Sequence, residues 1–179
     1  MARAGDTLHL GNDTLTFHRT AADTNGEYLE VEVDFAPAAF RPPIHYHPGQ
    51  HERLDILDGA LAVRMADTEQ LYSAGETVFT PPRCPHTLWN PGPAHARVMW
   101  RTTPALRTER LFETLWGLAA DHRIGPDGPL LQIALLTFAF RNEYRIVSPR
   151  PPAVDLCLSA LLAPLALARG YRPYHRSPR

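Results

Sequence analysis

Histidine and glutamate side chains crowd into the stretch IHYHPGQHER, and their types and spacing suit metal binding. His45 and His47 are two residues apart, so on a β-strand both side chains project from the same face. Two neutral imidazole nitrogens that converge on one point are good ligands for a divalent transition metal. Glu52 supplies a third ligand if the chain turns at Pro48-Gly49, a dipeptide typical of turns.

His51 is adjacent to Glu52, and we expect it not to be a ligand. Neighbouring residues of an extended chain face opposite ways, so only one of the two can reach the centre that His45 and His47 define. We assign that place to Glu52. Taken alone, the H-x-H pattern has an alternative interpretation as a pair of surface histidines that occur together by chance.

The elements that must position these residues have the pattern of an all-β barrel or sandwich. From Asp6 to about Thr103, short runs of strand-forming residues alternate with turn residues. Apolar and acidic side chains alternate strictly over residues 29–35, which predicts a strand with one buried face. Asp58-Gly59 is a dipeptide typical of hairpins, so we expect a hairpin turn there.

Helical spacing of apolar residues replaces this pattern after Pro104. We expect three helices, within residues 107–122, 127–144 and 151–170. The chain is therefore expected to consist of a β-barrel over residues 1–104 and a helical extension over residues 105–179, which packs on the barrel or on a partner.

The third helical segment is strongly apolar, and we expect another surface to cover it. Residues 153–168 contain one charge, Asp155, and an internal proline, Pro164, which should kink the helix. The segment is shorter than the roughly 20 apolar residues that span a bilayer. A homodimer is the expected arrangement. The alternative is peripheral membrane contact by residues 153–169, which the arginines that follow favour.

Composition excludes several partners and compartments. With 179 residues, a formal net charge of −1 and a pI near 6.7, the chain has no basic field for nucleic acid. Cys84 and Cys157 form no C-x-x-C motif, so neither a disulfide framework nor a zinc knuckle is indicated. The amino terminus lacks the apolar stretch of a signal peptide. We expect a cytoplasmic protein.

A second motif, GETVFTPPRCPHTLWN, completes a pattern that resembles the two-motif signature of the cupins. The first motif has the spacing His45-x-His47, four residues, Glu52, six residues, Gly59. The second has the spacing Gly75, five residues, Pro81, one residue, Arg83, two residues, His86, three residues, Asn90. The resemblance covers roughly residues 30–103. It implies an all-β jelly-roll (cupin) barrel that binds one metal through His45, His47, Glu52 and His86.

Two positions depart from the cupin pattern, which usually has glycine where this chain has Ala39 and Arg83. Glycine in a turn often serves a positive φ, which arginine tolerates poorly. The offsets to His45 and His86 are unchanged, so we expect altered loops with intact ligands. Cys84 is expected to be a small buried residue, not a fifth ligand. The helical extension is similar to that of a group of bacterial cupins and indicates architecture only.

The resemblance implies a divalent transition metal, one of Fe, Mn, Ni, Zn or Cu, with open coordination positions. We expect a dioxygenase-like oxidoreductase that acts on a small organic molecule chelated to the metal, because the sequence shows no second acid/base pair. Asn90, which shares the parity of His86, is expected to offer this molecule a hydrogen bond. A non-redox isomerase, cyclase or lyase and a non-catalytic metal- or ligand-binding module remain alternatives.

Overall fold

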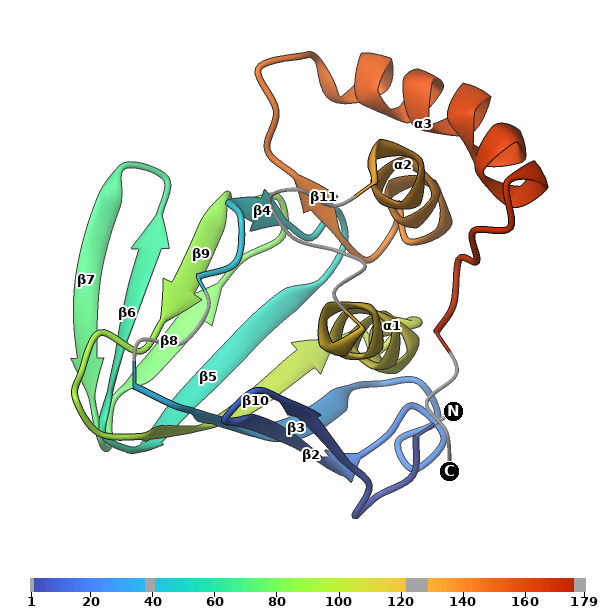
Figure 1. Cartoon of the computed structure of the whole chain (residues 1–179). Helices are drawn as coiled ribbons and strands as arrows, with labels where there is room; N and C mark the ends of the chain where they lie inside the picture. Colours follow the sequence, from blue (N-terminus) through green and yellow to red (C-terminus); the bar gives the residue numbers. More distant parts are fainter. Residues whose placement is uncertain (1, 38–40, 122–128, 176–179) are drawn as a thin grey trace.

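A computed structural model describes residues 2–37, 41–121 and 129–175 of the protein. Two antiparallel sheets face each other and diverge toward one end, and helices lie at that end (Figure 1). The predicted jelly-roll barrel with a helical extension is confirmed.

The larger sheet has the strand order β1-β2-β3-β10-β5-β8 and the smaller one the order β11-β4-β9-β6-β7. The strands of the larger sheet are β1 (Thr7–Leu10), β2 (Asp13–Arg19), β3 (Leu29–Phe35), β10 (Ala96–Thr103), β5 (His51–Asp58) and β8 (Thr77–Thr80). Those of the smaller sheet are β11 (Arg145–Ile146), β4 (His45–Tyr46), β9 (His86–Trp89), β6 (Ala60–Met65) and β7 (Thr68–Ser73).

The core lies between the sheets and follows from strand alternation. In β3, Leu29, Val31 and Val33 are buried while the acidic residues between them are partly exposed, as the sequence predicts. Leu54 of β5 and Leu88 of β9 bury their side chains in the same core cluster. Burial of these apolar side chains stabilises the two-sheet arrangement.

The hairpin expected at Asp58-Gly59 is wrong, although the turn is present. The strand before it, β5, pairs with β10 and β8 in the larger sheet, whereas β6 pairs with β7 and β9 in the smaller sheet. Gly59 has a φ of +72°, and a Cβ there would lie 2.5 Å from the carbonyl oxygen of His95. The glycine therefore carries the chain from one sheet to the other at a point where no side chain fits.

The three expected helices are present as α1 (Thr108–Ala120), α2 (Leu130–Ala139) and α3 (Pro152–Ala168). Phe112 of α1 packs into the barrel core, and Leu111 and Leu118 pack against Leu136 of α2 and the nearby Phe140. The second helix ends five residues before the expected position, and the chain then forms the short strand β11.

The outer face of α3 is apolar and exposed. Its buried residues are only Ser159, Ala163 and Ala166, whereas Leu161 is 76% exposed. Within the described residues, no helix is both long enough and apolar enough to cross a membrane. The homodimer expected to cover this face stays a prediction.

Candidate metal centre

Strand pairing brings the predicted ligands together from both sheets. His45 begins β4 and lies directly across from His86 of β9, while His47 immediately follows β4. Glu52 lies near the start of β5 in the opposite sheet. The turn between β4 and β5 at Pro48-Gly49 returns the chain toward the two histidines, as its sequence predicts.

The three histidines form a compact buried cluster. One ring nitrogen from each of His45, His47 and His86 lies within 4.8 Å of the others, and all three residues are buried. Three histidines arranged in this way can hold a metal ion. Glu52, which has no solvent exposure, places one carboxylate oxygen 3.2 Å from His47 Nε2 and the other 3.2 Å from His86 Nε2.

Backbone carbonyls fix the orientation of all three imidazoles through Nδ1. The partner of His45 Nδ1 is the carbonyl of Pro43 at 2.9 Å, and that of His86 Nδ1 is the carbonyl of Cys84 at 3.0 Å. His47 Nδ1 lies 2.6 Å from the carbonyl of Glu143. Since a carbonyl only accepts, each Nδ1 carries the proton, and in a neutral ring Nε2 is left as an unprotonated donor atom for a metal.

The centre contains buried atoms that require a cation. His47 Nε2, His86 Nε2 and one oxygen of Glu52 are buried without a hydrogen bond in the described part of the chain. The other oxygen of Glu52 accepts a hydrogen bond from Trp100 Nε1 at 3.0 Å. Lone pairs of nitrogen and carboxylate oxygen that face each other at 3.2 Å repel unless a proton or metal ion lies between them. The residues present therefore fit a divalent metal.

The electrostatics of the cluster point the same way. Burial, with the neighbouring His86 and His47, lowers the pKa of His45 to about 3, so this imidazole is neutral at pH 7. Burial alone would raise the pKa of Glu52, but His47 and His86 hold it well below its usual value. Burial pulls the pKa of His47 down, and Glu52 more than offsets this, so the pKa is raised. A carboxylate thus stays ionised and attracts positive charge at the centre.

His51, Cys84 and Arg83 lie outside the cluster. His51 faces away from Glu52 and packs its ring against Phe79, with 5.3 Å between ring centroids. Cys84 is only partly buried, contrary to the expectation of a buried residue, and is not in the histidine cluster. Arg83 adopts a φ of +63°, so the backbone accepts strain where the cupin pattern has glycine. Ala39 lies outside the described residues.

Asn90 is buried but has a structural role, so its expected hydrogen bond to a bound molecule is wrong. Its amide nitrogen donates to the carbonyls of Phe35, Ala36 and Ala94, and its side-chain oxygen accepts from the backbone of Gly92. These bonds use both amide hydrogens and one lone pair of the side-chain oxygen. Asn90 therefore connects the end of β9 to the loops around it and has no hydrogen left to donate to a ligand.

The helical extension contributes to this centre in a way that the sequence does not predict. Besides the Glu143 carbonyl, the extension supplies Tyr144, whose ring stacks on His45 with 4.5 Å between centroids. β11 then pairs with β4, with Ile146 opposite His45. No local pattern predicts these contacts, because a two-residue strand shows no alternation.

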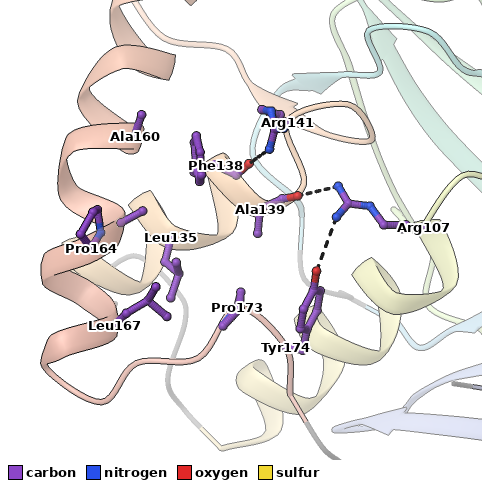
Figure 2. A pocket seen from close by; sticks show the side chains of 11 residues that line it. Arg107, Leu135, Phe138, Ala139, Arg141, Ala160, Pro164, Leu167, Pro173 and Tyr174 are labelled. Atoms are coloured by element: carbon purple, nitrogen blue, oxygen red, sulfur yellow. Dashed lines mark hydrogen bonds between the residues drawn. The ribbon is translucent and has the colours of Figure 1, made fainter.

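A separate hollow of about 430 Å³ lies between α2, α3 and the carboxyl-terminal segment (Figure 2). None of the three histidines lines it. At one end, Arg107 donates to the carbonyl of Ala139 at 2.6 Å and to the hydroxyl of Tyr174 at 3.5 Å. The same guanidinium also binds both carboxylate oxygens of Glu143, at 2.9 and 3.0 Å, so it connects the helices to the segment that supports His47.

The β-barrel of this chain is similar to cupin domains of known proteins. Residues 31–101 match the family model described as a cupin domain. An RmlC-like cupin from Shewanella frigidimarina is 18% identical, with 59% of this chain and 88% of that chain covered and a TM-score of 0.50. KdgF from a Halomonas species is 15% identical, with 58% and 92% covered and a TM-score of 0.50.

A predicted oxalate decarboxylase from Thermotoga maritima is also similar, at 15% identity, with 58% of this chain and 98% of that chain covered and a TM-score of 0.50. At these identities the likeness concerns the fold alone. No curated protein matches the sequence. The structures cover less than two thirds of this chain, so they do not account for all of it.

Proposed function

This chain belongs to the cupin superfamily through its residues 31–101, and from that premise we propose that it is a dioxygenase-like oxidoreductase. It would bind one divalent transition metal and act on a small organic molecule that coordinates this ion. The ligands in this proposal are His45, His47, Glu52 and His86. The observation that carries it is the set of three Nδ1 contacts to backbone carbonyls, which leaves Nε2 of each clustered imidazole able to bind a metal.

Each protein group has a defined task in this proposal. The carbonyls of Pro43, Glu143 and Cys84 keep the histidines in the tautomer that can bind metal. Trp100 holds one oxygen of Glu52 and so orients the carboxylate. When bound, a divalent ion would polarise an oxygen of the small molecule, and iron or manganese would also supply redox chemistry with dioxygen.

The surroundings of the ligands favour redox over acid/base chemistry. Leu54 and Leu88 are buried on the same strand faces as Glu52 and His86, so the barrel interior beside the ligands is apolar. The carboxylate of Glu143 is held by Arg107 and is not free to act as a base. In this proposal the chemistry therefore comes from an ion held by the ligands and not from a pair of acid and base side chains.

The test is metal analysis followed by measurement of oxygen uptake. Protein purified under nitrogen is loaded with Fe(II) or Mn(II), and oxygen consumption is recorded with a panel of small hydroxy, keto and phenolic acids. We expect one metal per chain and substrate-dependent oxygen uptake. His47→Ala should lose both, and His51→Ala, which changes a histidine of the same stretch, should keep both.

The other outcomes of this experiment favour the alternatives. Conversion of a substrate without oxygen uptake would contradict the oxidoreductase and favour a non-redox isomerase or cyclase. Metal binding without conversion of any substrate would favour a metal- or ligand-binding module. Mass spectrometry of small molecules that copurify with the protein is the quickest guide to the panel.

The proposal also covers the cellular compartment of the protein and its oligomeric state. Cys84 and Cys157 are free thiols, which fits a reducing compartment, and we propose that the protein works in the cytoplasm. We also propose that it forms a homodimer. The exposed leucines of α3, with Leu161 the most exposed, support this, because an uncovered apolar face of this kind favours association.

A further inference from the structure

We propose that Tyr144, which the helical extension contributes, both positions His45 and binds the small molecule held at the metal centre. Its ring holds His45, and its hydroxyl donates a hydrogen bond to a carboxylate or carbonyl oxygen of the small molecule bound there. This inference rests on the proposed metal site and names the chemistry of the ligand that the site accepts.

Three contacts hold the extension against the centre. The Glu143 carbonyl lies 2.6 Å from His47 Nδ1, and Val147 N donates to the carbonyl of Ile44 at 2.8 Å. Between these two points, β11 pairs with β4. Tyr144 is thus fixed on both sides by residues that contact the ligand-bearing strand, which is what a group needs in order to position others.

The ring of Tyr144 contacts two of the three histidines. It stacks on His45 with an interplanar angle of 30° and a centroid distance of 4.5 Å. It meets His47 at an angle of 65°, with 6.2 Å between centroids. Stacking of this kind restricts rotation of the His45 ring about its side-chain bonds, in addition to the bond at Nδ1.

The hydroxyl of Tyr144 is available for a ligand. In the described part of the chain, no group forms a hydrogen bond with it, although the residue is only partly exposed. A phenol carries its proton near neutral pH, so this hydroxyl can act as a donor. The ring of Tyr144 contacts two of the proposed metal ligands, and a phenol donor there would be complementary to an oxygen that carries negative charge or a carbonyl dipole.

The matched pair of variants is Tyr144→Phe and Tyr46→Phe. The first keeps the stacked ring and removes only the hydroxyl. The second removes a hydroxyl from the residue next to His45, whose side chain points to the opposite face of the strand. Each protein is loaded with Co(II), whose visible absorption reports on its ligands, and is titrated with acetate as a simple carboxylate probe.

We expect wild type, Tyr144→Phe and Tyr46→Phe each to bind one cobalt ion with the same starting spectrum. Acetate affinity should fall about tenfold in Tyr144→Phe, since one hydrogen bond to a charged group is lost. It should not change in Tyr46→Phe. In wild type, acetate should also perturb the ultraviolet difference spectrum of a tyrosine, and Tyr46→Phe should keep this signal.

The proposal is overturned if Tyr144→Phe binds acetate as tightly as wild type, or if the tyrosine signal is absent from wild type. The wild-type tyrosine signal requires no variant. Its absence would therefore overturn the proposal even if the Tyr144→Phe protein folds poorly. Failure of wild type to bind cobalt would refute the metal site and this inference together. Cobalt binding with unchanged acetate affinity would refute the role of Tyr144 alone.

Discussion

Replacement of Arg107 by alanine should destabilise the protein much more than replacement of an ordinary surface arginine. Arg107 is 40% exposed, but its partner Glu143 is only 2% exposed and receives both of its short hydrogen bonds from this guanidinium. Loss of one member of a buried pair costs about 3–5 kcal/mol, because the remaining charge is left without compensation. The exposure of Arg107 reduces this, so we expect a loss of about 2–3 kcal/mol in the free energy of unfolding.

Arg101 provides the matched control. It also binds a glutamate, Glu30, through two nitrogen atoms at 2.9 and 2.6 Å, but this pair lies on the exposed side of the larger sheet. Its alanine variant should lose less than about 1 kcal/mol. Urea unfolding followed by circular dichroism measures both losses from the transition midpoint and slope.

A double variant tests whether the loss of stability comes from the Arg107–Glu143 pair itself. If Arg107→Ala leaves the buried carboxylate of Glu143 without a cationic partner, then the addition of Glu143→Ala should recover part of the lost stability. It should not add a second full loss. Equal losses for Arg107→Ala and Arg101→Ala would refute the reasoning. So would strict additivity of the two changes in the double variant.

Three further predictions concern the ligands, the loop and the tail. His47→Ala should abolish stoichiometric metal binding while His51→Ala retains it, as elemental analysis of dialysed protein can show; one tight metal in the His47 variant would place the site elsewhere. Arg83→Gly should stabilise the protein by about 0.5–1 kcal/mol, because relief of the positive φ exceeds the added entropy of the unfolded chain; an unchanged or lower melting temperature would contradict this. Full-length protein should scatter light as a dimer, and a chain that ends at Ser148 should dimerise less or lose solubility; a detergent-free monomer would refute the dimer, and pelleting with lipid vesicles would favour membrane contact.

Local patterns account for the parts of the structure that the sequence predicts well. Alternation over residues 29–35 is enough to predict β3, because a strand with one buried face depends only on its own residues. Strand parity predicts that His45 and His47 point together, whereas the place of His86 beside them follows from the resemblance to the cupin motifs; the structure brings all three together.

Long-range pairing explains what the sequence does not reveal. Asp58-Gly59 signals a turn but does not say whether the next strand stays in the same sheet, and here it leaves. The strand parity of Asn90 correctly indicates that it is buried. It cannot reveal that the side-chain amide nitrogen donates hydrogen bonds to three backbone carbonyls. Tyr144 reaches His45 only because β11 joins the smaller sheet, which depends on the docking of the helices.

The hydrogen bond between His47 and the Glu143 carbonyl joins residues 96 positions apart, and this imposes a thermodynamic reciprocity on the molecule. If docking of the extension raises metal affinity tenfold, then metal must favour the docked extension by the same factor, equivalent to about 1.4 kcal/mol. Metal supply would then set how often α1 and α2 detach from the barrel. Amide hydrogen exchange in these helices would report on an ion that neither helix touches.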